Sequence, residues 1–124
     1  MISRVSSDGK LQCEATGACR DLDAAHIVPY RLDGHGSWAT NGLLLHRSIH
    51  TLWDADLVKL TYIPPFRWID VNKAGIEELY GEIAPSLISV LLNKSLRPNI
   101  LSNMSSLDQD NFIQNLRTRF ELRV

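Results

Sequence analysis

The pattern of apolar and polar positions predicts short strands in the first half of the chain. Residues 22–28 alternate loosely between the two kinds and run into a proline, which is typical of a strand end. Residues 42–45 are short and apolar, which favours a buried strand. Residues 57–62 and 66–71 are rich in strand-forming side chains, and the two prolines between them favour a hairpin-like reversal. Residues 11–13 are a further candidate strand.

Helical spacing begins between these two groups of strands. Ile49, Leu52 and Trp53 recur at positions i, i+3 and i+4, and they predict a helix with one buried stripe. His50 and Asp54 lie four residues apart, on a second stripe of the same helix. The helix would therefore bury one side and present an imidazole and a carboxylate on another.

Three further helices are predicted in the second half. The first spans residues 73–80 and ends at Gly81, and the second has Pro85 as its first residue. The third begins near Ser106, a favourable N-cap. Apolar positions predict the inner faces of the last two helices: Leu87, Ile88, Leu91 and Leu92, then Phe112, Ile113, Leu116 and Phe120. The arginines of the last helix fit the negative end of its dipole without any ligand: Arg117, Arg119 and Arg123.

These elements together predict an α+β fold in one domain of 124 residues. We divide it into an N-terminal segment (1–12), a core region (13–62) and a C-terminal hairpin and helical extension (63–124). A hydrophobic fraction of 44% and a charged fraction of 22% are typical of a folded protein. No apolar run approaches the roughly 20 residues of a membrane span, and the first ten residues lack a signal peptide's apolar core. We therefore expect a cytoplasmic protein with no membrane partner.

Charge and cysteine usage narrow the function classes. DNA-binding proteins usually carry a basic excess, because phosphate neutralisation supplies much of their affinity. The net charge here is −1, so any binding of nucleic acid must depend on a few local side chains or be supplied by a partner.

Cys13 and Cys19 have no second cysteine pair, and we do not expect a structural zinc site.

All four histidines lie between residues 24 and 57: His26, His35, His46 and His50. Hydrolysis of a phosphodiester needs a base to activate water and a cation to neutralise the charge that grows on the phosphate. Histidine suits the first role because its ordinary pKa of about 6.5 lies close to working pH. Histidine together with a carboxylate suits a divalent metal. A histidine on a strand that faces a His/Asp pair on a packed helix would place both functions across a small gap.

The order His-x-x-Pro, then Asn, then His nine residues later resembles the HNH family of ββα-metal nucleases. The segments AAHIVPY and NGLLLHRSIHTLWDADL resemble one large branch of that family, and the likeness covers roughly residues 13–62. The resemblance implies a ββα-metal core, to which this chain adds a β-hairpin and C-terminal helices.

The resemblance also gives each matching residue a role. His26 matches the general base that activates the attacking water, and Asn41 matches the asparagine that pins the loop and so orients the base. His50 matches a metal ligand on the helix, and Asp54 a further ligand one helical turn on. Magnesium is the expected ion, with manganese or nickel as alternatives.

One position departs from the family pattern. Ala25 stands where many members carry a histidine or aspartate that binds the metal from the strand. Asp23 lies two residues earlier, so on a strand its side chain shares the face of Ala25. We expect Asp23 to complete the metal shell, directly or through water. Without it the metal site would be weaker than usual, or the copy impaired.

Substrate contacts are expected near the start of the central helix. Arg47 is the first candidate for a phosphate contact, and Arg31 is the second. His46 could extend the His50 stripe, contact a phosphate or merely end the strand. His35 and Trp38, in the glycine-containing loop, are weaker candidates for substrate contact.

The sequence thus predicts a metal-dependent DNA endonuclease with a one-metal HNH mechanism, which leaves 5′-phosphate and 3′-hydroxyl ends. We expect it to work as the nuclease module of a larger defence-type or phage-related assembly, with partner subunits or as a homodimer. A stand-alone enzyme stays open. The alternative class is a catalytically impaired HNH fold that binds DNA or protein, and Ala25 motivates it.

Overall fold

The computed structural model describes residues 11–28, 40–97 and 104–122. Its elements follow in this order: β1 (Leu22–His26), β2 (Gly42–His46), α1 (Arg47–Asp54), β3 (Lys59–Leu60), β4 (Trp68–Ile69), α2 (Lys73–Tyr80), α3 (Ala84–Leu91) and α4 (Ser106–Arg117). A 3-10 turn at Gly81–Ile83 joins α2 to α3, and a π-helical turn at Thr118–Leu122 continues α4. The expected α+β fold is confirmed, with a ββα unit followed by a second hairpin and C-terminal helices.

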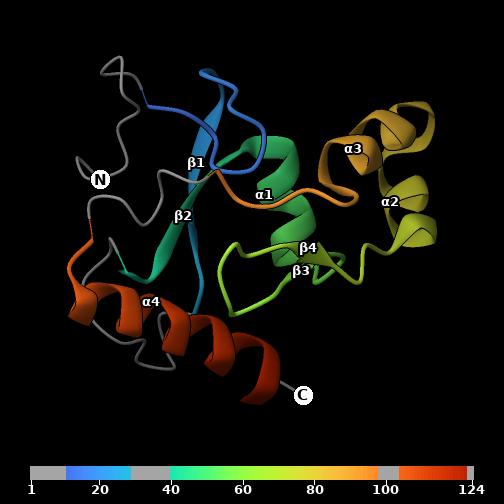
Figure 1. The fold of residues 1–124 in the computed structure, drawn as a ribbon. Helices are drawn as coiled ribbons and strands as arrows, with labels where there is room; N and C mark the ends of the chain where they lie inside the picture. Colours follow the sequence, from blue (N-terminus) through green and yellow to red (C-terminus); the bar gives the residue numbers. More distant parts are fainter. Residues whose placement is uncertain (1–10, 29–39, 98–103, 123–124) are drawn as a thin grey trace.

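β1 and β2 form an antiparallel pair whose register runs from Leu22 opposite His46 to His26 opposite Gly42. Side chains alternate between the two faces of a strand, so Asp23 and Ala25 share one face of β1 and His26 lies on the other. Ala25 is fully buried and His26 is exposed, as this alternation requires. Figure 1 shows α1 between this pair of strands and the α2–α3 pair.

The free edge of β2 is covered by Glu14 rather than by a third strand. The Glu14 N–H donates to the Leu44 carbonyl at 2.7 Å, and the buried Glu14 carboxylate accepts from the Leu44 N–H at 2.7 Å. The strand predicted at residues 11–13 is not formed, and Leu11 makes only an isolated bridge. A carboxylate that satisfies the strand's own N–H closes the edge in its place.

The second hairpin turns where the two prolines predicted it, but its strands are much shorter than expected. Only Lys59 opposite Ile69 and Leu60 opposite Trp68 pair between β3 and β4. Residues 94–96 hydrogen-bond to other backbone groups of β4 and of the residues before it. Trp68 N–H donates to the Lys94 carbonyl, and Leu96 N–H donates to the Phe66 carbonyl. The ladder is therefore divided between two partners in short pieces.

The later helices follow the predicted apolar spacing closely. α2 spans the predicted residues and ends at Gly81, whose φ of 58° suits glycine. α4 begins one residue earlier than expected, because Ser105 rather than Ser106 is the N-cap and accepts from the Asp108 N–H at 3.1 Å. Leu92 was expected on the inner face of α3 but is exposed, because it lies past the helix end in extended backbone. No helix among the described ranges is long and apolar enough to cross a membrane.

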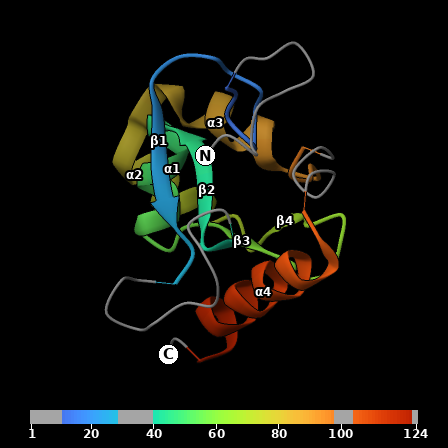
Figure 2. The same ribbon diagram turned by 90° about the vertical axis from the view of Figure 1, so that its left-hand side faces the viewer.

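Trp53 of α1 lies at the centre of the aromatic core. Its ring meets Trp68 and Phe120 edge-on, at centroid distances of 6.1 and 5.5 Å. Phe112 of α4 makes a similar edge contact with Phe66 at 5.2 Å. In both views α4 lies across the end of the sheet where β1 ends and β2 begins (Figures 1 and 2). The last helix therefore shares its core with the ββα unit.

Replacing Phe112 by alanine tests how strongly α4 is held to this core. Phe112 is fully buried, so Phe112→Ala should lower the free energy of unfolding by about 3–5 kcal/mol through lost burial and a cavity. Leu107→Ala on the same helix is the matched control, because Leu107 is 69% exposed and the change should stay within about 0.5 kcal/mol. Urea denaturation measures both. Equal losses would mean that α4 is not docked as described.

Candidate active site

Asn41 ties together the two ends of the segment between β1 and β2. Its side-chain oxygen accepts from the Val28 N–H at 2.8 Å, and its side-chain nitrogen donates to the Val28 carbonyl at 3.2 Å. Its own carbonyl accepts from the Ile27 N–H at 3.0 Å. An amide side chain suits this position because it offers an acceptor and a donor side by side, as a paired peptide does. These contacts tie Asn41 to the two residues that directly follow β1.

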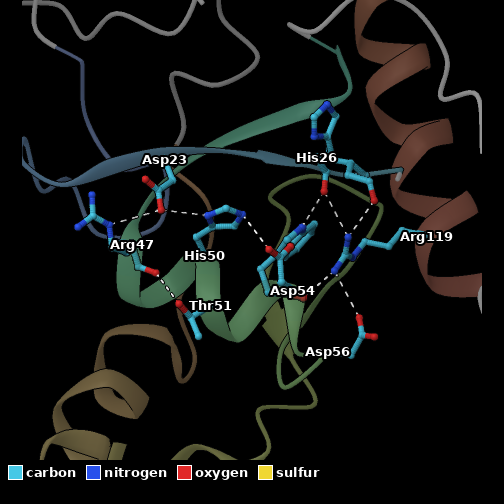
Figure 3. Close-up of polar contacts among 10 residues, drawn as sticks. Asp23, His26, Arg47, His50, Thr51, Asp54, Asp56 and Arg119 are labelled. Atoms are coloured by element: carbon cyan, nitrogen blue, oxygen red, sulfur yellow. Dashed lines mark hydrogen bonds and ion pairs between the residues drawn. The ribbon is translucent and has the colours of Figure 1, made fainter. Parts of the chain in front are cut away.

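A row of polar side chains lies along one side of β1 (Figure 3). His50 is at its centre, with Nδ1 at 3.1 Å from Asp23 Oδ2 and Nε2 at 3.0 Å from Asp54 Oδ2. Both His50 and Asp23 are about three-quarters buried, whereas the Asp54 side chain is 63% exposed. The residues predicted to bind metal are thus neighbours, with the solvent side at Asp54.

Local structure explains why these three side chains meet. His50 and Asp54 are one helical turn apart, and the stripe of Ile49, Leu52 and Trp53 beside them holds α1 against the core. Asp23 shares the inner face of β1 with Ala25, and the small alanine is buried between strand and helix. The Asp23 carboxylate therefore projects beside the first turns of α1.

The pair formed by His50 and Asp54 offers two donors that could hold a divalent cation. His50 Nε2 and Asp54 Oδ2 are separated by 3.0 Å, which is an ion-pair distance and also brings both donors close enough to share one ion. Imidazole nitrogen with carboxylate oxygen is a common donor set for such ions. The Asp54 side chain is 63% exposed, so a cation held by this pair would also be open to solvent.

Asp23 is placed differently from the sequence expectation. It contacts Nδ1 of His50, on the opposite side of the ring from the nitrogen that Asp54 faces, so one ion cannot bind at both contacts. Within residues 11–28, 40–97 and 104–122, no group of three or more histidine, cysteine or acidic side chains is arranged to hold an ion. A shell completed directly by Asp23 is therefore not what this geometry shows.

His26 does not face the His50–Asp54 pair. Figure 3 shows its imidazole on the side of β1 away from that pair, as the alternation of the strand dictates. Its backbone carbonyl points inward, where it accepts from Trp53 Nε1 at 2.9 Å and from Arg119 Nη1 at 3.3 Å. The structure thus places the expected base and the expected metal ligands on different faces of the strand end.

The residues predicted to contact substrate have different surroundings in the structure. His46 is the N-cap of α1, because its Nδ1 accepts from the Ser48 N–H at 3.2 Å. Arg47 is 68% exposed, and its Nε lies 3.8 Å from Asp23 Oδ2, so its guanidinium is open to an incoming phosphate. Arg31, His35 and Trp38 lie outside the described residues.

Two polar residues near the C-terminus reach this region, and the sequence interpretation missed both. Arg119 is 4% exposed and contacts the β1 end and α1, so its expected role as a mere dipole partner is wrong. Asn115 is fully buried and donates to the Thr40 carbonyl at 2.8 Å. Spacing offered a signal, since Asn115 and Arg119 stand three residues after Phe112 and Leu116 and continue the same buried stripe.

Comparison with known proteins agrees with the geometry of the ββα unit. Residues 13–60, less than half of the chain, match a family model described as HNH endonuclease. No curated protein and no solved structure matches the chain. The family consists of nucleases, which are hydrolases, and its members generally use divalent metal ions. The segment that contains β1, β2 and α1 is therefore similar to the HNH endonuclease family over residues 13–60.

Proposed function

We propose that the chain is a metal-dependent DNA endonuclease that acts at the end of β1 and along α1. The observation that carries the proposal is the row Asp23–His50–Asp54, beside a strand end whose loop is pinned by Asn41. The match of residues 13–60 to HNH endonucleases supports the reaction class. A cation held by His50 Nε2 and Asp54 would neutralise charge on the phosphate and on the leaving oxygen.

His26 is the group that we assign to water activation. It is the last residue of β1 and is exposed, so a water molecule at the strand end can reach its imidazole. Its ring and the His50–Asp54 pair lie on different faces, so the substrate backbone would have to cross the end of the strand to meet both. Arg47, at the start of α1, would bind a neighbouring phosphate.

We assign Asp23 to the orientation of His50 rather than to the cation itself. A metal-binding histidine commonly donates its other ring N–H to a carboxylate, which fixes the tautomer and the ring plane. Asp23 Oδ2 lies at 3.1 Å from His50 Nδ1 and can accept that proton. Nε2 is then the nitrogen left for the ion, on the side of Asp54. Under this assignment no other side chain takes the place of the metal ligand that is missing at Ala25.

A cleavage assay with two variants tests the proposed reaction. The wild-type chain should nick supercoiled plasmid in Mg²⁺ or Mn²⁺ and lose this activity in EDTA. His26→Ala should lower the rate by about 10²–10⁴-fold, the usual contribution of a general base, and should keep Mn²⁺ affinity. His50→Ala should lose both. A wild-type chain that binds no divalent ion and cuts no DNA would favour the alternative, an HNH fold used for binding.

Two substitutions of Asp23 separate orientation from direct ligation. Asparagine keeps an oxygen that can accept from His50 Nδ1, so Asp23→Asn should change Mn²⁺ affinity by less than about tenfold, whereas Asp23→Ala should cost about 10–100-fold. Asp54→Asn is the comparison, because it alters an assigned ligand. Calorimetric titration with Mn²⁺ measures all three. If Asp23→Asn weakens binding as much as Asp54→Asn does, Asp23 is a ligand.

We also propose that the chain acts as the nuclease module of a larger assembly. A role of that assembly in defence is proposed from the family resemblance alone. The support is the net charge of −1, which leaves DNA binding to a few local side chains such as Arg47. The isolated chain should therefore bind duplex DNA weakly, with a slope of log K against log salt of about −2. Fluorescence anisotropy across a salt series measures the slope. Tight binding with a slope of about −6 would indicate a stand-alone DNA-binding enzyme.

A further inference from the structure

We propose that the C-terminal helix is a positioning element of the active site, and that Arg119 is the residue through which it sets the place of His26. The inference rests on the proposed function, because it takes His26 as the base. It adds a part of the chain that lies outside residues 13–60, the only segment matched by the family model.

Arg119 joins the end of β1 to the end of α1. Nη1 donates to the Ile27 carbonyl at 3.0 Å and to the His26 carbonyl at 3.3 Å, and Nη2 donates to the Trp53 carbonyl at 2.6 Å. Nη2 also lies 3.3 Å from Asp56 Oδ1. One rigid guanidinium thus sets the distance between the residue that we assign as base and the helix that carries His50 and Asp54.

Aromatic packing fixes the guanidinium in turn. Its central carbon lies 4.0 Å from the centroid of the Trp53 ring, and the same indole donates its N–H to the His26 carbonyl at 2.9 Å. The His26 carbonyl therefore receives two donors, one from α1 and one from the turn that continues α4 (Figure 3). A shift of either element would move the backbone of His26.

Asn115 holds the other end of the same segment. It lies one helical turn before Arg119 and donates to the carbonyl of Thr40, the residue before Asn41. The segment between β1 and β2 thus leaves the sheet at a peptide held by Arg119 and returns at a peptide held by Asn115. Asn41 ties the two ends to each other, and α4 ties both ends to the rest of the fold.

The choice of arginine supports a geometric role over a purely stabilising one. Burying a guanidinium is costly, and apolar residues of similar volume often give equal or greater stability in a core. What the apolar residue cannot provide is a set of directed donors in one plane. At Arg119 these donors go to carbonyls of two separate elements, both of which carry residues assigned to the reaction.

Two variants of Arg119 and one control test the proposal on the full chain. Arg119→Met fills the site without donors, and Arg119→Lys keeps the charge but not the planar fork. Arg117→Met is the matched control, because it removes the same charge two residues earlier, at the end of α4, from an exposed residue beside Tyr62. Steady-state cleavage in Mg²⁺ gives kcat and KM, calorimetry gives Mn²⁺ affinity, and NMR of the metal-free protein gives the carbonyl ¹³C shifts of His26 and Ile27.

Arg119→Met should lower kcat by about 10²-fold, the loss that a displacement of about 1 Å can cause, while KM and Mn²⁺ affinity stay within twofold. The two ¹³C shifts should move, Arg119→Lys should lose less activity, and Arg117→Met should match the wild type.

Unchanged kcat with unchanged shifts would overturn the proposal. So would losses of kcat and Mn²⁺ affinity in proportion to the unfolded fraction; if the methionine variant does not fold, the lysine variant decides. A wild type that cuts no DNA refutes the proposed function, whereas the shifts still decide whether Arg119 sets the backbone of His26.

Discussion

The backbone carbonyl of His26 is where three parts of the chain meet. It ends β1, it accepts the indole N–H of Trp53 from α1, and it accepts a guanidinium N–H of Arg119 from beyond α4. A carbonyl oxygen has two lone pairs, so both bonds can form at once, and moving either element alone would break one of them. The same Trp53 ring packs against Trp68 and Phe120, which links the strand end to the aromatic core. The position of the exposed imidazole therefore depends on packing that lies far from it in the sequence.

Local periodicity is why much of the fold could be predicted from the sequence. The stripe of Ile49, Leu52 and Trp53 defined α1, and Gly81 ended α2, because both signals act within a few residues. The short β3–β4 ladder and the missing strand at residues 11–13 could not be foreseen in the same way. In the first case the ladder is shared with the distant residues 94–96. In the second, Cys13 bonds to Ala18 in a local turn, and only Glu14 pairs with the distant Leu44. Long-range backbone pairing leaves no pattern in the sequence of one strand.

The candidate site shows the same division between local and distant information. The spacing of His50 and Asp54 placed both on one helix face, and strand alternation placed Asp23 on the face of Ala25. Alternation also implies that the His26 side chain points to the opposite face from Asp23. The expectation that His26 faces the His50–Asp54 pair across a small gap was therefore inconsistent with the strand pattern. The contact of Asp23 with Nδ1 depends on how the ring is rotated, which spacing does not specify. Arg119 was misjudged because the dipole argument considered only its own helix.

Ala25 connects these observations. A metal-binding side chain at this position would have to lie between β1 and α1, where the alanine is now fully buried. With a small residue there, the strand packs directly on the helix, and the nearest carboxylate on that face is Asp23, which meets the far side of the His50 ring. Under our assignment the site then has two protein ligands instead of three, so more of its geometry must come from the scaffold. A strand end fixed by Asn41, Trp53 and Arg119 provides that geometry, since the side chain of each bonds to backbone next to the end of β1.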